Sequence, residues 1–304
     1  MERFQRVLAA LDMGAKGDEV TAGSRKALER AVWIARRVGA SLTVLHSEKS
    51  DEYWDPETDG FIPGRVGDSD RRGILEKTLA GLATEAVQTH VVVRSESAWL
   101  AVVQEVLRQK IDVVLAAKRT STHSDDRRLG AVARKLLRKC PCAVWLEDPR
   151  ESRDPSIILA ATDLTPVGDR VVELSASVAH ALGAKLHIVH GFSLSMEAQL
   201  EGGEARRKFE RQQRDRSVAH IERVLATTPI AGSADVHVGL TSPTQAVLES
   251  LARLRPGLVV MGTVSRGGIP GLLIGNTAER LIDRIDCALL TVKPKEFVCP
   301  VTLN

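Results

Sequence analysis

The residues with the clearest chemical potential form a glycine-rich stretch at positions 261–279, MGTVSRGGIPGLLIGNTAE. It begins at the end of a short apolar run and leads into a helical pattern. A glycine at position 262 allows a sharp turn and a close approach of a ligand to the backbone. Gly275, Asn276 and Thr277 stand where free N–H groups and the helix dipole favour an anion. The stretch is typical of a phosphate-binding loop.

The same residues also allow a purely structural interpretation. Asn276 can cap the following helix, and Glu279 is placed to reach back to it. A glycine-rich strand–loop–helix is by itself weak evidence for a phosphate site. Both interpretations stay open at this point.

A second chemical feature is Asp163, which directly follows an apolar run. In open parallel sheets, ligands bind outside the carboxyl ends of the strands, where the strand order reverses. If the strands that end at Asp163 and Gly262 are neighbours there, Asp163 faces the same crevice and can accept a hydrogen bond from a base or ribose. Val189 and His190, at the end of another strand, can form a wall of that crevice. Asp163 can instead be a turn or cap residue, a role for which Thr165 competes.

An internal repeat places these residues in the second of two similar halves. Each half alternates short apolar strands with longer helical patterns, which predicts a parallel sheet with helices on both faces. The clearest matched pairs of segments are 6–12 with 157–163, 39–46 with 183–190, and 142–146 with 287–291.

The repeat divides the chain into domains. We expect a first domain at 1–148, a second at 154–296 and a C-terminal tail at 297–304. The charged stretch 147–155 contains two prolines and is typical of an exposed boundary. Long stretches follow the second strand of each half and are interpreted as lids or as tolerated surface insertions.

The composition limits the class of protein. Of the 304 residues, 43% are hydrophobic but only 3% aromatic, so the core must be built from Val, Leu, Ile and Ala, as in parallel sheets. The net charge is +3, which predicts neither a nucleic-acid nor a membrane surface. The apolar runs are too short to span a bilayer, and the start has no apolar signal region. With four cysteines, a cytoplasmic protein with reduced thiols is expected.

Other reactive side chains carry weaker signals. Cys140 and Cys142 flank a proline, and Cys142 and its repeat mate Cys287 are interpreted as small buried core residues. No set of four ligands suggests a zinc site. His46 and His190 are repeat mates, and a structural role is favoured over a ligand contact. No catalytic triad or pair of carboxylates is evident, so no dedicated enzyme is predicted.

The repeat, the aspartate after the first strand and the glycine loop together resemble the universal stress protein family over nearly the whole chain. The family pattern is Gly, two residues, Gly, nine residues, Gly, and then Ser or Thr. Gly262 and Gly275 keep the first and third positions. Ser265 replaces the second glycine, and Asn276 replaces the Ser or Thr, with Thr277 directly after it.

The resemblance is to the tandem, E-type members. It implies two doubly wound parallel five-stranded sheets, Rossmann-like and similar to the adenine nucleotide alpha hydrolases, with strand order 3-2-1-4-5. It also implies an intramolecular pseudo-dimer in which Val144 and Leu290 lie near the interface of the fifth strands. ATP-binding members hold adenine near the strand-one aspartate and phosphates on the glycine loop. In this chain those roles fall on Asp163, Val189, Gly262, Ser265, Gly275, Asn276 and Thr277.

The first half lacks most of this pattern. Its loop after the fourth strand has no first glycine and keeps only Gly130. Lys118, Arg119, Arg127 and Arg128 can attract an anion, but the interpretation favoured is a solvated charged loop. No conventional nucleotide site is predicted in the first domain.

These features predict a stress-response protein that binds ATP in its second domain and acts by binding or regulation. The partners expected are an adenine nucleotide, a regulatory protein and a second copy of the chain. An alternative, motivated by Ser265 and the first domain, is an interaction module without a nucleotide. A third is slow ATP hydrolysis or adenylyl transfer, although no base or metal ligand set is evident beyond Asp163.

Overall fold

The computed structural model describes residues 4–14, 17–47, 53–55, 60–62, 68–118, 129–151, 153–193, 203–263 and 275–303. The chain divides into two compact units. The N-terminal unit is Phe4–Arg150 together with Cys299–Asn304, and the C-terminal unit is built on Glu151–Val298. The last residues therefore group with the N-terminal unit, where the Cys299 thiol lies 3.5 Å from the carbonyl oxygen of Lys139.

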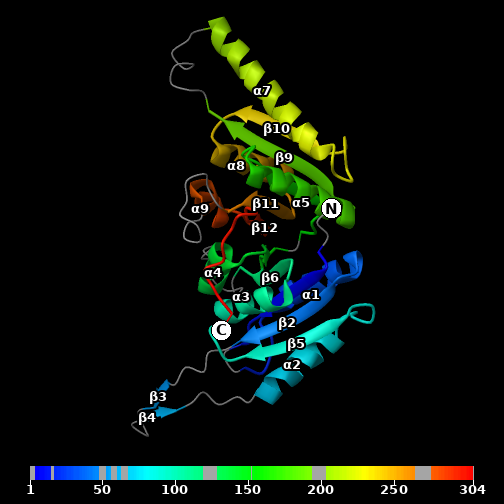
Figure 1. Cartoon of the computed structure of the whole chain (residues 1–304), viewed down its shortest axis with the longest axis vertical. Helices are drawn as coiled ribbons and strands as arrows, with labels where there is room; N and C mark the ends of the chain where they lie inside the picture. The colour runs from blue at the N-terminus through cyan, green and yellow to red at the C-terminus, as the bar shows by residue number, and fades with distance from the viewer. Residues whose placement is uncertain are drawn as a thin grey trace. The chain divides into compact units, whose positions relative to one another are not determined.

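The N-terminal unit contains a parallel sheet in the order β5-β2-β1-β6-β7 (Figure 1). A short antiparallel pair, β3 with β4, interrupts the long stretch after the second strand. The elements are β1 (Arg6–Leu11), α1 (Ala22–Val38), β2 (Ser41–Ser47), β3 (Tyr53–Asp55), β4 (Gly60–Ile62), α2 (Asp68–Ala80), β5 (Thr89–Arg94), α3 (Ala98–Gln109), β6 (Val113–Ala117), α4 (Ala131–Lys139) and β7 (Ala143–Glu147).

The C-terminal unit repeats this arrangement in the order β10-β9-β8-β11-β12, again parallel. When the five strands of each parallel sheet are numbered in chain order, both sheets have the order 3-2-1-4-5. This order confirms the predicted fold class. The expected pairing of the two copies through their fifth strands stays a prediction. The elements are β8 (Ile157–Ala161), α5 (Pro166–Leu182), β9 (Lys185–Phe192), α7 (Gly203–Leu225), β10 (Asp235–Leu240), α8 (Pro243–Leu254), β11 (Leu258–Gly262), α9 (Asn276–Ile282) and β12 (Ala288–Val292).

Local sequence signals explain where the helices begin and end. The Thr165 hydroxyl caps α5 by accepting from the Gly168 N–H at 3.2 Å, and Pro166 occupies the first turn. Gly39 and Gly183 end the equivalent helices α1 and α5 in the left-handed conformation, with φ of 70° and 65°. In the C-terminal unit α5 packs with α7, and α8 packs with α9. Right-handed crossovers place these two pairs on opposite faces of the sheet.

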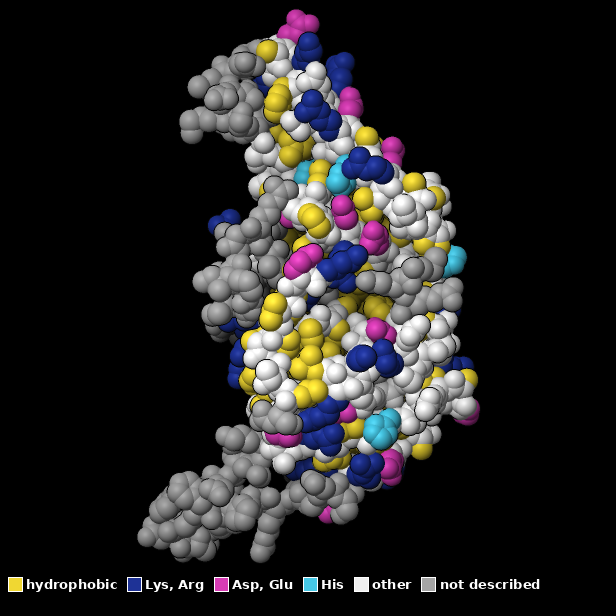
Figure 2. Space-filling model, viewed as in Figure 1, with side chains coloured by type: hydrophobic (Ala, Val, Ile, Leu, Met, Phe, Trp, Pro, Cys, Tyr) yellow, Lys and Arg dark blue, Asp and Glu magenta, His cyan; other side chains and the backbone are white. Residues whose placement is uncertain are grey.

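The core consists of aliphatic strands, as the composition predicts. Ile158, Leu159, Val259 and Val260 of β8 and β11 are fully buried, because helices cover both faces. Trp145 is also fully buried, and its indole N–H is satisfied by the Glu147 carboxylate at 2.9 Å. On the face shown in Figure 2, Lys and Arg side chains lie among Asp and Glu side chains, in keeping with the net charge of +3. Among the described helices, none combines the length and apolar character that a bilayer crossing needs.

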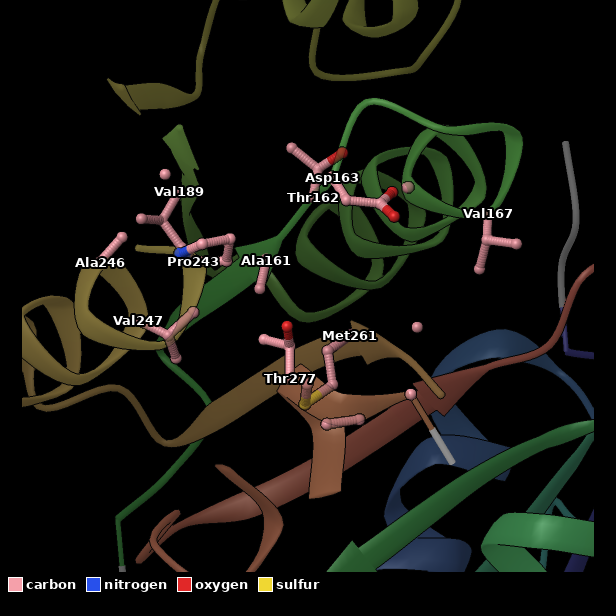
Figure 3. Close-up of a pocket in the computed structure, with 15 residues that line it drawn as sticks. Ala161, Thr162, Asp163, Val167, Val189, Pro243, Ala246, Val247, Met261 and Thr277 are labelled. Atoms are coloured by element: carbon pink, nitrogen blue, oxygen red, sulfur yellow. The ribbon is translucent and has the colours of Figure 1, made fainter. Parts of the chain in front are cut away.

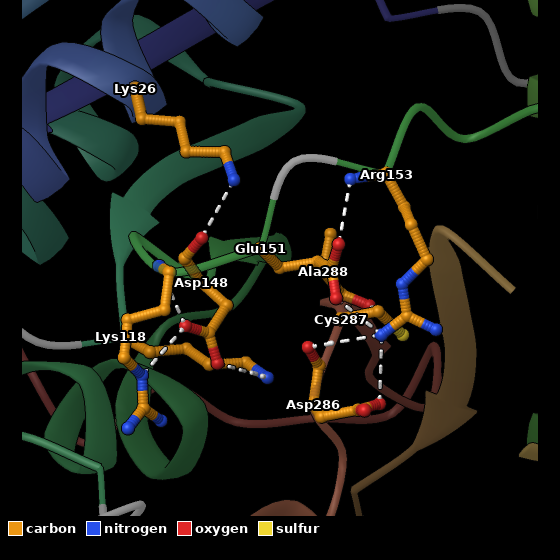
Figure 4. Close-up of polar contacts among 9 residues, drawn as sticks. Lys26, Lys118, Asp148, Glu151, Arg153, Asp286, Cys287 and Ala288 are labelled. Atoms are coloured by element: carbon orange, nitrogen blue, oxygen red, sulfur yellow. Dashed lines mark hydrogen bonds and ion pairs between the residues drawn. The ribbon is translucent and has the colours of Figure 1, made fainter. Parts of the chain in front are cut away.

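The linker is more constrained than the sequence suggests. Arg153 pairs with Glu151 at 2.5 Å and with Asp286 at 3.1 Å, and these two carboxylates raise the pKa of its guanidinium (Figure 4). Pro155 is buried, while Asp154 stays exposed. The prediction of an exposed boundary at 147–155 is therefore wrong at its end, where Pro155 is buried against the C-terminal unit.

All four cysteines are free. Cys287 is buried as predicted, but Cys142 is partly exposed and the buried residue of the pair is Cys140. The two sulfur atoms lie 3.5 Å apart. Desolvation, followed by the Cys140 thiol, raises the pKa of Cys142 well above its usual value.

Candidate functional site

A cavity of about 370 Å³ opens at the carboxyl ends of β8, β9 and β11 in the C-terminal unit (Figure 3). β8 pairs with β9 on one side and with β11 on the other, so the cavity lies where the strand order reverses. This is the position at which open parallel sheets bind ligands. Its size falls within the range of about 300–1,000 Å³ that is usual for small-molecule sites.

Five of the seven sequence-predicted site residues line this single cavity: Asp163, Val189, Gly262, Gly275 and Thr277. They come from three strand ends and from the start of α9. Ser265 lies outside the described residues. Asn276 is the first residue of α9, and its side chain is outside the described part of the chain.

Helix α8 contributes a wall of the cavity that was not predicted from the sequence. Pro243, Ala246 and Val247 line the cavity from the first turns of this helix (Figure 3). Ser242 caps the helix by accepting from the Gln245 N–H at 3.2 Å. The pair Ser242-Pro243 signals a helix start, but only the strand order shows that this helix packs over β9 and β8. The wall supplies apolar surface suited to a flat, weakly polar group.

Asp163 has a structural role as well as a place in the cavity. Its Oδ1 accepts from the backbone N–H of Thr165 at 3.1 Å and from the Thr165 hydroxyl at 2.5 Å. Thr165, not Asp163, is the cap of α5. Between them Leu164 adopts a φ of 58°, which is unusual for a non-glycine residue, and its N–H donates to the Thr162 hydroxyl at 3.1 Å. These hydrogen bonds hold a strained turn and fix the position of the aspartate.

The Thr165 cap gives a first prediction. We expect Thr165→Ala to lower the free energy of unfolding by about 1 kcal/mol, because the N–H of Gly168 and Asp163 Oδ1 both lose a partner. Chemical denaturation followed by circular dichroism measures this change. Thr165→Ser keeps the hydroxyl and should retain most of the stability. Equal losses in both variants would contradict the capping role.

Position 262 requires a glycine for a different reason from the sharp turn that was expected. It is the last residue of β11 and pairs in register with Val292, so it does not make a sharp turn. A Cβ atom on it would lie 2.8 Å from Val167 Cγ1. The glycine therefore allows α5 to approach the end of β11 closely.

The loop that follows is closed at its base by a backbone hydrogen bond. The N–H of Gly275 donates to the carbonyl oxygen of Thr263 at 2.8 Å. This bond brings the two ends of the glycine stretch together and places Gly262 and Gly275 on the same cavity.

The predicted cap by Asn276 is wrong. The capping position of α9 belongs to Gly275, whose carbonyl oxygen accepts from the Glu279 N–H at 2.9 Å. Gly275 has no side chain with which to satisfy the first-turn amides. Those amides stand at the edge of the cavity, since Gly275 and Thr277 both line it.

The strand-two histidines are structural, as favoured from the sequence. His190 Nδ1 donates to the Thr162 carbonyl at 2.9 Å, and His46 Nδ1 donates to the Leu11 carbonyl at 3.0 Å. Each bond ties the second strand of its unit to the first. Val189 and Gly191 line the cavity but His190, although described, does not, so its suggested place in the wall is wrong.

The equivalent region of the N-terminal unit is built differently. Lys118 occupies the position of Thr263, since its carbonyl oxygen accepts from the Gly130 N–H at 2.9 Å. Its side chain is 2% exposed, and Nζ lies 3.7 Å from Asp148 Oδ2 (Figure 4). The prediction of a solvated residue is wrong for Lys118, because its charge is compensated by a buried carboxylate. Three of the predicted loop cations lie outside the described residues, namely Arg119, Arg127 and Arg128.

Comparison with known proteins identifies the family. The sequence profile of the Universal stress protein family matches residues 3–146 and 156–293. The chain belongs to the universal stress protein family. It carries two family domains in tandem, as the internal repeat predicts.

Two relatives and one solved structure match this universal stress protein over 97% or more of its length. It is 23% identical to Universal stress protein E of Photorhabdus laumondii over 326 residues, which covers 99% of the chain and 98% of the relative. It is 24% identical to Universal stress protein E of Escherichia coli K12 over 332 residues, with 100% and 98% covered. A functionally unknown protein of Pseudomonas aeruginosa PAO1 has a similar structure, with a TM-score of 0.72, 20% identity and 97% and 94% covered. The latter likeness shows the fold alone.

Proposed function

We propose that this universal stress protein binds an adenine nucleotide, ATP in the first instance, in the cavity of its C-terminal unit. It acts in the stress response through this binding or through regulation of a partner. The observation that carries the proposal is the convergence of Asp163, Val189, Gly262, Gly275 and Thr277 on one cavity at the reversal of strand order. The resemblance to the family's ATP-binding members implies nucleotide contacts at these same positions.

The chemistry of the cavity suits the parts of a nucleotide. Val189, Ala246 and Val247 offer an apolar wall for a base. Asp163 is held at the cavity edge and can accept from a ribose or base N–H or O–H. The start of α9, at Thr277, offers backbone amides and a positive dipole end for phosphate.

Calorimetric titration with ATP tests the proposal, together with mass spectrometry of small molecules released from the denatured protein. We expect saturable binding of one nucleotide per chain. Gly275→Val is the site variant, because its side chain would intrude where the loop closes. A protein that neither releases nor binds any adenine nucleotide would refute the proposal.

A second candidate is an interaction module that holds no nucleotide. It is favoured by the structural explanations that Gly262 and Asp163 already have. Gly262 makes room for Val167, and Asp163 holds the turn before α5. Stoichiometric nucleotide in the purified protein would exclude this candidate.

We further propose that the protein has no dedicated catalytic reaction and hydrolyses ATP weakly at most. Asp163 is the carboxylate among the residues that line the cavity. Its Oδ1 already accepts two hydrogen bonds from Thr165. If the protein hydrolyses ATP and the Asp163→Ala substitution lowers this rate without changing ATP affinity, Asp163 has a catalytic role instead.

A further inference from the structure

Two histidines stack at the edge of the C-terminal sheet, away from the cavity lining. His187 on β9 and His237 on β10 have ring centroids 5.3 Å apart and ring planes that differ by 14°. His187 Nδ1 lies 3.0 Å from His237 Nε2. At that distance one nitrogen must donate and the other must accept.

Arg253 on α8 decides which nitrogen donates. Its Nη2 lies 3.3 Å from His237 Nδ1, and a guanidinium can only donate. His237 Nδ1 therefore accepts, and the proton of this ring is on Nε2, which donates to His187 Nδ1. The hydrogen bonds run in one direction, from Arg253 to His237 to His187, and they need both rings neutral. A proton added to either ring would place two donors against each other.

The surrounding charges do little to accommodate such a proton. Asp235 Oδ2 lies 3.4 Å from His187 Nδ1 but also pairs with Lys185 at 2.9 Å, and both Asp235 and Lys185 are substantially exposed. The acidic residue of α8 is Glu249, which accepts from Gln245 at 2.9 Å. The carboxylate next to the pair is therefore screened by solvent and shared with a lysine.

The pKa values of both histidines follow from this setting. Desolvation is the main cause that lowers the pKa of His187 below 6.5, with Asp235 opposing it. Desolvation and then Arg253 lower the pKa of His237. Helix α7, which packs against β10, buries Ser217, Ile221 and Leu225 and adds no carboxylate from these positions.

We propose that Arg253, His237 and His187 form an acid-released latch that ties α8 to β9 and to the edge strand β10. Above neutral pH the latch is closed. On acidification the rings take up protons, the hydrogen-bond chain breaks, and α8 loosens together with Pro243, Ala246 and Val247, which it contributes to the cavity wall. The latch does not depend on what the cavity binds.

The direction of the effect follows from linkage. The histidines have a lower pKa in the closed state than the ordinary 6.5 that they regain on opening, so opening takes up protons. Stability from the latch is complete above pH 6.5 and is lost as the pH falls below it. An opened histidine at pH 5 is almost fully protonated, which favours opening by up to about 30-fold per ring.

Hydrogen exchange of the full-length protein at pH 8, 6.5 and 5 tests the latch, with each amide corrected for its intrinsic rate. Protection in α8 and β10 should fall by about tenfold or more between pH 8 and pH 5. The equivalent α3 and β5 are an internal reference, because Thr43 and Val92 occupy the repeat positions of the two histidines. Their protection should change much less.

The double variant His187→Thr with His237→Val copies those repeat residues and should make protection in α8 independent of pH. Should it fold poorly, His237→Gln serves instead, since glutamine keeps a donor and an acceptor without titrating. His180→Gln, at an exposed position on α5, is the matched control and should retain the acid response. Acid-induced loss of protection that persists in either latch variant, or no loss in the unmodified chain, would overturn the proposal.

Discussion

Ala161→Phe is expected to weaken ATP binding by about 100-fold or more, which corresponds to ~2.7 kcal/mol. Ala161 is the last residue of β8 and lies in register between Val189 of β9 and Met261 of β11. Its side chain points into the cavity (Figure 3). A phenyl ring at this position would fill the space between the strand ends and exclude a base. Titration of the purified variant with ATP measures the loss.

The repeat supplies a control with the same chemical change. Ala10 is the last residue but one of β1 and pairs with Leu45, as Ala161 pairs with Val189. Ala10→Phe should therefore leave ATP affinity unchanged, since the site is proposed in the C-terminal unit alone. If Ala161→Phe binds ATP as the unmodified chain does, the nucleotide does not occupy this cavity. If only Ala10→Phe loses binding, the site lies in the N-terminal unit.

Gly257→Ala is expected to produce the largest loss of stability, about 3 kcal/mol or more. A Cβ atom there would lie 2.1 Å from the carbonyl oxygen of Asp154 and 2.9 Å from Pro155 Cα. These are backbone atoms, which cannot rotate away. Gly257 also donates to the Ile157 carbonyl at 3.0 Å and accepts from the Ala288 N–H at 3.2 Å. A shift to relieve the contact would disturb the start of three neighbouring strands.

Denaturation of this variant can be assigned to one unit. The four tryptophans, Trp33, Trp54, Trp99 and Trp145, all precede the C-terminal unit. Their fluorescence reports on the N-terminal unit, whereas circular dichroism reports on both. For Gly257→Ala, we expect the circular dichroism transition to begin at a lower denaturant concentration than the fluorescence transition. The two transitions can separate because a chain of two units need not unfold in one step.

Gly239→Ala is the matched control for this prediction. Its added Cβ would meet Thr241 Cγ2 at 3.7 Å, an ordinary contact. It should therefore unfold at nearly the same denaturant concentration as the unmodified chain. Equal behaviour of Gly257→Ala and Gly239→Ala would show that the linker can move away from β11.

Much of the fold could be predicted because its signals are local. The strand that ends at Gly262 is a short apolar run, and α5 has a Thr-Pro start and a glycine end. The repeat then fixed the number of domains. The predicted cap at Asn276 failed by one residue, which is within the usual uncertainty of helix boundaries.

The site was only partly predictable, because its remaining contacts join residues far apart in the sequence. The approach of Val167 to Gly262 can be predicted only once the strand order is known. The same holds for Val247, which α8 brings to the strand ends. The burial of Lys118 depends on a carboxylate 30 residues away, at Asp148 (148 − 118). Charge alone suggested solvent exposure, since lysine is rarely buried without a partner.

The backbone bond at the base of the glycine loop has a consequence for divergence between the two copies. It joins residues twelve apart in each unit, Thr263 with Gly275 (275 − 263) and Lys118 with Gly130 (130 − 118). The enclosed segments, 264–274 and 119–129, have equal length but little sequence in common. The two bonds join main-chain atoms, so this closure needs no particular side chain at Thr263 or Lys118. The same closure is therefore kept in both copies although the sequence between its two ends has diverged.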